Sequence, residues 1–340
     1  MSHQVCMLPY LQGVGGMASF QRKFIQGLIE NKVNYSFDPL DKNNDAILVI
    51  GGTRQVPKLL TTRRRGVRIV QRLNGMNWLH RVVKTDPKAW LRSETANMLL
   101  SYIRRYVCER IAYQSEFSHW WWDKEHGKVN KEFRVIHNGV DLERFTPEGD
   151  HTLPVDRYRI LLVEGHLSGL YSRGLDMAAQ LVASLQDEHH LPVELCIAGD
   201  VSETIKKFYI ERYTNITMQW LGIIPPEGIP ALDRSAHALY SADLNAACPN
   251  SVIEAMACGL PILAYDTGAL KELVGKKAGA IVPYGSNHWQ LETPDVKSLA
   301  AAALPILKNN RPFRESARKR AEEAFGLDQM TKAYLDVLLG

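Results

Sequence analysis

Short apolar runs alternate with longer amphipathic or polar segments along the whole chain, and this alternation constrains the fold more than any other feature. The runs are too short to be helices and are bounded by glycine, proline and polar residues. Short buried strands separated by helices predict parallel sheets with crossover connections, which is an α/β fold. The candidate strands are residues 5–8, 46–50, 67–71 and 109–113, followed by 160–163, 193–198, 216–221, 237–241, 261–265 and 280–282.

A polar segment near the middle of the chain predicts a domain boundary. Residues 146–154 read Thr-Pro-Glu-Gly-Asp-His-Thr-Leu-Pro, with two prolines and one glycine. A chain of 340 residues is also longer than one ordinary core needs. We expect two doubly wound domains, residues 1–150 and 151–325, with ligands at the carboxyl ends of the strands and a cleft between the domains. Residues 326–340 are expected to form a C-terminal helix that returns to the first domain.

The segment 248–261 reads Cys-Pro-Asn-Ser-Val-Ile-Glu-Ala-Met-Ala-Cys-Gly-Leu-Pro. Its apolar residues recur at helical spacing, and Gly259 followed by Pro261 predicts the end of a helix. Asn250 or Ser251 is expected to cap the first turn. The start of such a helix presents free amides and a partial positive charge to an anion.

The same segment has a purely structural interpretation. Ser251 and Glu254 have the spacing of a capping box, in which the glutamate side chain reaches back to an amide of the first turn. Capped helices are more common than nucleotide sites, so this segment alone favours structure. The other motifs decide between the two.

Arg173 is expected near the first turn of the next helix after the strand at residues 160–163. A cation is unfavourable at the positive end of a helix dipole, so an anion shared between the helix and the arginine explains it better. The alternative is an arginine that faces solvent.

Two segments of the first half follow predicted strands. Residues 12–17, Gln-Gly-Val-Gly-Gly-Met, form a glycine-rich turn that lets the backbone approach a phosphate or a sugar, or is simply a tight turn. Residues 72–78 follow another strand and so lie where ligands usually bind. Asn138 and Gly139 precede the predicted boundary and favour a turn.

Charge is divided unevenly along the chain. Residues 1–150 contain 23 Lys or Arg against 15 Asp or Glu, whereas residues 151–340 contain 18 against 22. The first half is therefore expected to face something anionic, such as a membrane surface, a phosphorylated acceptor or nucleic acid. Nucleic acid is not expected as a partner, because no tandem aromatic and basic pattern of an RNA-binding sheet is present.

Several classes of protein and site are not indicated by the sequence. The five cysteines are odd in number and widely spaced, so we expect neither a disulfide framework nor a zinc site. There is no phosphate loop of the Walker type and no Gly-x-Ser-x-Gly elbow. Because no apolar run is long enough to span a bilayer and the first ten residues do not resemble a secretory signal, we expect a cytoplasmic protein.

In this order, these segments resemble family 4 glycosyltransferases of the GT-B fold. The resemblance implies two Rossmann-like domains that face a central cleft, with the sugar-nucleotide donor bound mainly by the second and the acceptor by the first. It implies transfer with retention of configuration and no metal ion. The residues that carry it are Gly15, Gly16, Asn138, Gly139, Val140, Asp141, Phe145, Gly165, Arg173, Gly174, residues 251–261, Gly268 and Glu272.

The resemblance also implies roles for individual residues. Arg173 occupies the place usually held by a lysine and His166 that of an arginine, both close to the donor phosphates. Glu254 would bind the ribose hydroxyls. On this basis Arg173, His166 and Glu254 are the expected catalytic residues. Expected donor-binding residues are Gly15, Gly16, Asn250, Ser251, Val252 and Glu254, and expected acceptor-side residues are Arg72, Asn74, Asn77 and Asn138.

One position departs from the family pattern. Family members commonly carry an acidic residue separated from the second acid by seven others, and that residue contacts the transferred sugar. Here the position is Ala246, and its neighbour is Ala247. Asp243 is the nearest carboxylate upstream. Activity and the choice of donor sugar therefore depend on what replaces the missing acid.

The resulting hypothesis is a retaining, hexosyl-type glycosyltransferase in cell-surface polysaccharide or glycolipid synthesis. Its partners would be a nucleotide sugar, a glycan or lipid-linked acceptor and, through the basic first domain, the inner face of an anionic membrane. One alternative is a nucleotide-sugar epimerase on the same architecture. Another is a degenerate nucleotide-sugar-binding subunit that lost turnover with the acid at position 246.

Overall fold

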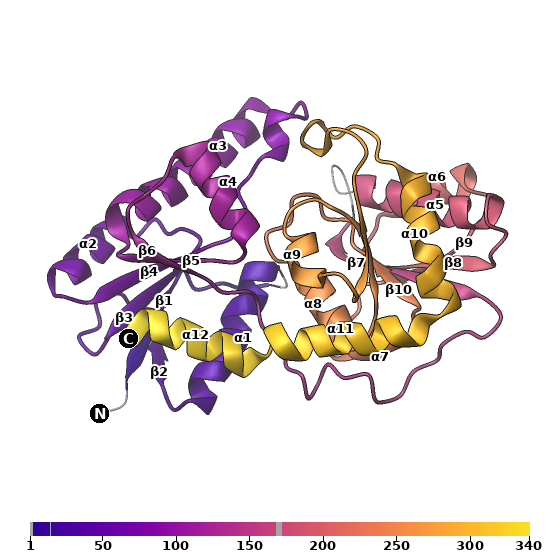
Figure 1. The fold of residues 1–340 in the computed structure, drawn as a ribbon. Coiled ribbons are helices and arrows are strands. Elements are labelled where there is room, and N and C mark those ends of the chain that lie inside the picture. The colour runs from indigo at the N-terminus through magenta and orange to yellow at the C-terminus, as the bar shows by residue number, and fades with distance from the viewer. Residues whose placement is uncertain (1–2, 14, 168–171) are drawn as a thin grey trace. The chain divides into compact units, whose positions relative to one another are not determined.

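The computed structural model describes residues 3–13, 15–167 and 172–340. The chain forms two compact units, Met1–Gly139 with Phe325–Gly340, and Val140–Ala324. Each unit contains a six-stranded sheet in which every strand pair is parallel, with helices packed on it (Figure 1). The α/β class expected from the alternating apolar runs is confirmed.

The first sheet has the strand order β2-β1-β3-β4-β5-β6. Its strands are β1 (Gln4–Leu8), β2 (Asn34–Ser36), β3 (Ala46–Ile50), β4 (Arg68–Leu73), β5 (Arg110–Tyr113) and β6 (Glu132–Val135). The helices of this unit are α1 (Gly16–Glu30), α2 (Val56–Arg64), η1 (Leu79–Arg81), α3 (Pro87–Tyr102), η2 (Ile103–Val107), α4 (Glu116–His126) and α12 (Leu327–Leu339).

The second sheet has the order β9-β8-β7-β10-β11-β12, which is the Rossmann order with its reversal between β7 and β10. Its strands are β7 (Tyr158–His166), β8 (Val193–Asp200), β9 (Thr217–Gly222), β10 (Ala238–Tyr240), β11 (Ile262–Tyr265) and β12 (Gly279–Val282). Its helices are α5 (Ser172–Asp187), α6 (Glu203–Arg212), η4 (Pro226–Gly228), α7 (Ile229–Arg234), α8 (Asn250–Ala257), α9 (Leu270–Val274), η5 (His288–Gln290), α10 (Val296–Lys308) and α11 (Asn310–Ala324). Within the described residues, no helix of either unit is both long and apolar enough to cross a membrane.

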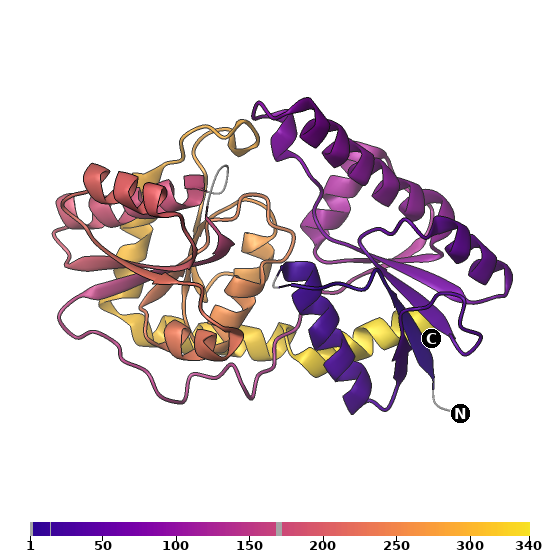
Figure 2. The ribbon, with the colours of Figure 1, turned by 180° about the vertical axis from the view of Figure 1, so that it is seen from behind.

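The C-terminal helix α12 packs against α1 in the core of the first unit (Figure 2). The Tyr334 ring lies 5.2 Å from that of Phe20 and 5.4 Å from that of Phe24, measured between ring centroids. A Cβ added at Gly27 would lie 2.0 Å from Oγ1 of Thr331, so the two helices approach closely where α1 has no side chain. The last residues of the chain thus complete the core of the first unit.

The boundary between the units differs from the prediction at residue 150, because it lies between Gly139 and Val140. The polar segment after Val140 is bound to the second unit through its carbonyl groups. Arg318 donates to Phe145 O at 2.7 Å, and Arg234 donates to Thr146 O at 3.1 Å. A proline-rich composition marked an irregular segment, but side chains far along the chain decide to which unit it belongs.

Two strands were missed by the sequence analysis. β2 and β6 are the edges of the first sheet, and their residues are mostly exposed. An edge strand has a neighbour on one side only and is not required to be apolar on both faces. It therefore lacks the continuous apolar run by which the buried strands were found.

Candidate functional site

The carboxyl edge of the second sheet collects most of the residues singled out in the sequence. β7 and β10 are the neighbouring strands at which the strand order reverses, the position where open α/β sheets bind ligands. The chain leaves β7 toward the start of α5 and leaves β10 toward the start of α8. Because all six strands are parallel, Arg173, Asp243 and the first turn of α8 follow strand ends at the same edge.

Two glycines hold the loop after β10 close to its neighbours. A Cβ at Gly174 would lie 2.5 Å from Cβ of Ala242, and a Cβ at Gly268 would lie 2.5 Å from both N and O of Ala246. Gly268 also has a φ of +59°, and the next amide, of Ala269, donates to Ala246 O at 2.8 Å. The loop is therefore fixed between the start of α5 and the turn before α9.

The first turn of α8 differs from the expected cap. The N-cap is Pro249, in an extended conformation, and among the described residues no side chain caps the helix. Asn250 and Ser251 lie inside the helix, so the predicted caps and the Ser251–Glu254 capping box are wrong. Proline disfavours the helical conformation in the residue before it, so the helix begins directly after Pro249, two residues earlier than the box requires. The amides of Asn250, Ser251 and Val252 belong to a first turn without a side-chain cap.

Gly259 ends α8 as predicted. It has a φ of +71°, and its amide donates to Met256 O at 2.9 Å while that of Leu260 donates to Ala255 O at 2.8 Å. This is the arrangement of a Schellman-type helix end. The length of α8 is therefore set by Pro249 on one side and Gly259 on the other.

Glu254 is partly buried on α8. Its negative charge acts on Asp233 at the end of α7, whose pKa is raised well above its ordinary value first by burial and then by Glu254. The carboxylate of Glu254 is thus close enough to the α7 side of the helix to disfavour ionisation of Asp233.

Arg173 is the second residue of α5, so the predicted position at a helix start is confirmed. Its terminal nitrogen donates to the backbone oxygen of Glu292 at 2.6 Å, and Tyr284 Oη donates to the same oxygen at 2.7 Å. The Nε atom of Arg173 is buried, and within the described part of the chain it has no hydrogen-bond partner. A buried donor without a partner is rare and points to a ligand.

His166 is the last residue of β7, where its backbone pairs with Asp200 after an irregularity that begins at Val163. The side chain of His166 lies outside the described residues. The expectation that His166 contacts the donor phosphates therefore rests on its position at the end of β7.

Glu164 and Asp243 form a pair of interacting carboxyl groups at the point where the strand order reverses. The pKa of Glu164 is raised to about 8, first by burial and then by the negative charge of Asp243. The pKa of Asp243 is raised as well. Ala246 and Ala247, at the position of the missing acid, are buried. The nearby carboxyl groups therefore come from the end of β7 and from the loop after β10, and only Asp243 had been considered from the sequence.

Asn245 and Thr267 are two further polar residues beside Ala246 that the sequence did not indicate. Asn245 has a φ of +59°, is 3% exposed, and neither polar atom of its side chain has a partner among the described residues. The hydroxyl of Thr267, also 3% exposed, likewise has none within the described part. Asn245 precedes Ala246 in the chain, whereas only the fold brings Thr267 to the same place, through the close contact of Gly268 with the backbone of Ala246.

In the first unit, the glycine-rich turn leads directly into α1. Gly15 is the N-cap, Gly16 is the first helical residue, and no side chain within the described residues caps this helix. A Cβ at Gly15 would meet nothing within 4 Å, so packing within the protein does not require glycine there. Gly13 has a φ of +96° and does require it.

Arg72 and Asn138 come together in the first unit, but both are buried. The Arg72 guanidinium donates to Oδ1 of Asn138 at 2.8 Å and lies 3.8 Å from the centre of the Phe20 ring. Asn77 is exposed, and its amide donates to Oδ1 of Asn97 at 3.0 Å. The carbonyl of Asn74 accepts from Trp122 Nε1 at 2.7 Å. These four residues shape the carboxyl edge of the first sheet, and Asn77 is the most accessible of them.

Comparison with protein families matches residues 152–324 to the model of glycosyl transferases group 1, which is half of the chain. The chain belongs to the glycosyl transferases group 1 family. The matched residues include both Arg173 and the whole of α8. The structure therefore places the group 1 sequence pattern on the Rossmann-ordered sheet.

Two curated proteins are similar to part of this chain. The D-inositol 3-phosphate glycosyltransferase of Corynebacterium jeikeium is 28% identical over 166 residues, which are 44% of this chain and 39% of that protein. The MMP alpha-(1->4)-mannosyltransferase of Mycolicibacterium hassiacum is 26% identical over 57% of this chain and 45% of that protein. The matched part of this chain thus spans less than half the length of either relative.

Solved structures show that the group 1 chain has the GT-B fold. Sucrose-phosphate synthase from Thermosynechococcus elongatus superimposes with a TM-score of 0.77 at 16% identity, covering 98% of both chains. Anabaena Alr3699/HepE, solved in complex with UDP and glucose, gives a TM-score of 0.71 at 15% identity and covers 99% of both chains. The predicted pair of Rossmann-like domains is confirmed.

Among the described residues of the group 1 chain, no group of three or more His, Cys, Asp or Glu side chains is placed to hold a metal ion.

The raised pKa of Glu164 predicts a pH-dependent stability. A carboxyl group whose pKa is about 8 in the folded protein stabilises it at low pH, and this contribution is lost as the pH rises from the unfolded value near 4.5 to 8. Glu164→Gln keeps the shape of the protonated acid and cannot ionise. We expect the melting temperature of the wild type to fall relative to this variant between pH 5 and about 8.

Melting curves across this pH range, for wild type, Glu164→Gln and Asp243→Asn, measure the effect. The asparagine variant removes the Asp243 charge that raises the pKa of Glu164, so its loss of stability should begin at the same pH, end at a lower pH and be smaller in total. If the melting temperatures of wild type and Glu164→Gln change with pH in the same way, the Glu164 carboxyl group ionises as it does in water, which contradicts the prediction.

Proposed function

We propose that this protein transfers a sugar from a nucleotide-sugar donor to a glycan or lipid-linked acceptor, with retention of configuration. The observation that carries the proposal is the edge of the second sheet, where Arg173 and the first turn of α8, which has no side-chain cap in the described structure, follow strands next to the reversal of strand order. Both supply hydrogen-bond donors and positive charge, which is what a diphosphate requires.

Each donor-side residue has a proposed part in the reaction. The amides of Asn250, Ser251 and Val252 bind the phosphates and the sugar, and Glu254 binds the ribose hydroxyls. When the glycosidic bond to the donor breaks, negative charge grows on the departing diphosphate. Preorganised donors aimed at that charge are usually the largest catalytic contribution, and we assign them to Arg173, His166 and the helix amides.

The acceptor is proposed to bind the first unit. Gly15 and Gly16 form the start of α1, where no side-chain cap is found in the described structure. Their backbone is proposed to contact the donor diphosphate. Of the acceptor-side residues, Asn77 is exposed, while Arg72 and Asn138 support the site from within. The named relatives act on an inositol phosphate and form a mannosyl linkage, and by analogy we propose a role in cell-surface polysaccharide or glycolipid synthesis.

The missing acid at Ala246 leaves the transferred sugar without its usual carboxylate. We propose that Asp243 replaces it, with the amide of Asn245 as a second contact, because both lie in the loop that contains Ala246. The buried polar atoms of Asn245, which have no partners among the described residues, would be satisfied by sugar hydroxyls.

The test is release of nucleoside diphosphate from a panel of UDP-, GDP- and ADP-sugars, measured with and without simple acceptor sugars or lipid-linked acceptors. Transfer with the product anomer equal to that of the donor would establish the proposal. Conversion of the donor to another nucleotide sugar without any acceptor would instead establish an epimerase.

Ala246 also supports a second candidate function, a subunit that binds nucleotide sugar without turning it over. Calorimetry distinguishes the two, because this candidate requires tight binding of a nucleotide sugar with no release of diphosphate under any acceptor condition. Ala246→Glu, which restores the family acid, would then be expected to introduce slow donor hydrolysis.

A further inference from the structure

The positive charge of the first half is concentrated in one segment. Residues 54–106 contain 13 Lys or Arg and only 2 Asp or Glu. Both acids are already engaged. Asp86 caps α3 by accepting from the amide of Ala89 at 3.1 Å, and Glu94 accepts from Arg81 Nε at 2.6 Å. The pKa of Glu94 falls to about 2, mainly through Arg81. Arg72 and Arg104 are buried, but the other basic residues still leave the surface formed by α2, η1 and α3 with an excess of positive charge.

One face of α3 within this segment is apolar and exposed. Leu91, Met98 and Tyr102 are 58%, 65% and 45% exposed, and their spacings of seven and four residues place them on the same side of the helix. The other side of α3 packs on the rest of the unit, since Asn97 is buried there and Leu100 lies against Gly52. The exposed apolar side chains therefore lie on the face of α3 that the described part of the unit leaves open. The exposed residues Trp90 and Tyr106 continue the apolar face at either end.

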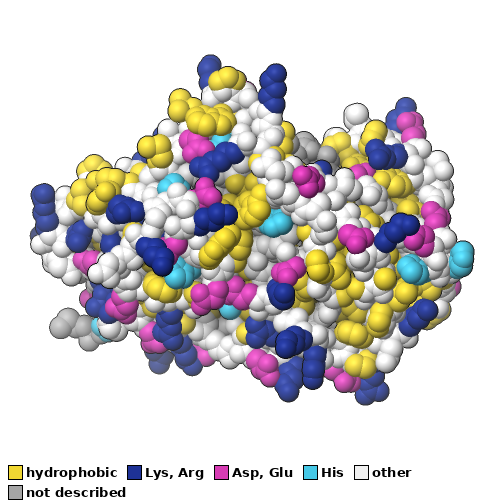
Figure 3. All heavy atoms as spheres, turned by 45° about the horizontal axis from the view of Figure 1, so that its top comes forward, with side chains coloured by type: hydrophobic (Ala, Val, Ile, Leu, Met, Phe, Trp, Pro, Cys, Tyr) yellow, Lys and Arg dark blue, Asp and Glu magenta, His cyan; other side chains and the backbone are white. Residues whose placement is uncertain are grey.

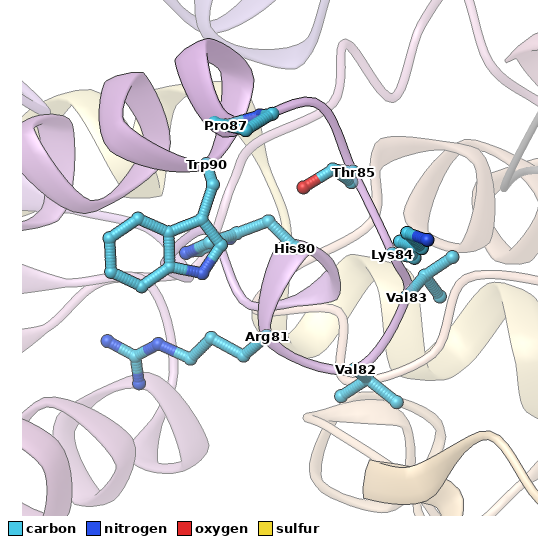
Figure 4. Close-up of a pocket in the computed structure, with 8 residues that line it drawn as sticks. All are labelled: His80, Arg81, Val82, Val83, Lys84, Thr85, Pro87 and Trp90. Atoms are coloured by element: carbon cyan, nitrogen blue, oxygen red, sulfur yellow. The ribbon is translucent and has the colours of Figure 1, made fainter.

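Basic side chains border this apolar face. Lys84, Lys88 and Arg92 are exposed, and none of the ion pairs found within the described residues involves them. Apolar and basic side chains are interspersed over this part of the surface in Figure 3. At one end of the face, a pocket of about 390 Å³ is lined by Lys84 and Trp90, whose side chains are shown in Figure 4. A surface with apolar residues at its centre and cations around them combines the two contacts that a lipid bilayer offers.

We propose that the α3 face, defined by Leu91, Met98, Tyr102, Lys84, Lys88 and Arg92, docks on the surface of a bilayer that contains anionic lipids. The apolar side chains would enter the interface between headgroups and acyl chains, and the basic ones would contact the headgroups. A second copy of the chain fits less well, because two α3 faces would bring their positive charges together. A nucleic acid would meet the charge but would leave the apolar side chains exposed to water.

This proposal goes beyond the proposed function, and it is tested without nucleotide sugar, so that either can fail without the other. The measurement is co-sedimentation of the full chain with vesicles of phosphatidylcholine alone, or with about a third of phosphatidylglycerol, at low and high salt. We expect binding only to the anionic vesicles, weakening as salt rises. Each basic residue near an anionic surface contributes about fivefold in affinity. The triple variant Lys84→Gln/Lys88→Gln/Arg92→Gln should therefore bind the anionic vesicles about a hundredfold more weakly than wild type does.

Leu91→Ser/Met98→Ser tests the apolar part and should weaken binding by about tenfold or more while the charge is unchanged. The matched control is Ile210→Ser/Ile223→Ser, which removes two exposed apolar side chains of the second unit and should bind as wild type does. The proposal is overturned if wild type ignores anionic lipid, or if the control and the α3 variants bind equally. It is also overturned if the α3 variants instead abolish a dimer seen by size-exclusion chromatography, or abolish binding to duplex DNA while vesicles remain unbound.

Discussion

Replacement of Arg173 with alanine is expected to lower kcat/KM for sugar transfer by about a hundredfold or more, the usual cost of one preorganised donor to a developing negative charge. Arg173 lies at the start of α5, where a cation opposes the helix dipole unless an anion is present. Its Nε atom is buried and has no partner among the described residues. An incoming diphosphate would satisfy this nitrogen and share the charge.

Three measurements separate this role from a structural one. Donor affinity by calorimetry should fall together with kcat/KM, whereas the melting temperature should change little, because Arg173 makes one hydrogen bond to the backbone of Glu292 in the described structure. Arg173→Lys should recover part of the activity, since it keeps the charge. Arg311→Ala is the matched control, an exposed arginine of the same unit paired with Glu315. Unchanged donor affinity in Arg173→Ala would remove the phosphate assignment.

Gly268→Ala is expected to destabilise the second unit by about 3 kcal/mol, which for a unit of this size lowers the melting temperature by roughly 6 to 12 °C. The added Cβ would lie 2.5 Å from the backbone N and O of Ala246, and a φ of +59° is unfavourable for any residue with a Cβ. Neither contact can be relieved by moving a side chain, because the atoms that clash are backbone. The loop that carries Asn245 must shift, so activity should fall more than stability alone predicts.

Gly222→Ala is the control for the backbone term. Gly222 has a φ of +69°, but a Cβ there would meet nothing within 4 Å. It should therefore cost about 1 kcal/mol, or roughly 2 to 4 °C. The difference between the stability losses of the two variants measures the cost of the contact between the added Cβ and the backbone of Ala246. Equal losses would mean that the Gly268 turn yields easily and does not hold the Ala246 loop in place.

The buried strands were predictable because each must be apolar on both faces. The run Ala46–Ile50 is entirely buried, as an interior parallel strand has to be. The edges β2 and β6 were not predictable in this way, since they face solvent. The end of α8 was also predictable, because Gly259 adopts a positive φ that other residues avoid. Its start was not, because serine, asparagine and proline are all common there and Pro249 took the cap position.

At the candidate site, the sequence placed Arg173 and α8 after strands of the second half, but it did not show their neighbours. Glu164, which follows the predicted strand at residues 160–163, and Asn245 had not been considered as site residues. Their importance follows from the strand order, which makes β7 and β10 adjacent although 71 residues separate the last residue of β7 from the first of β10 in the chain. No local pattern encodes such an adjacency.

What the sequence determined by itself is the α/β class, the tandem of two domains and the group 1 motif with alanine in place of its first acid. These follow from local rules of apolar periodicity, turn residues and motif spacing. The tertiary structure alone decided that residues 140–150 belong to the second unit, which rings of α1 the C-terminal helix packs against, and that Glu164 interacts with Asp243 at the carboxyl edge of the second sheet. These depend on contacts between segments far apart in the chain, which arise only when the sheets assemble.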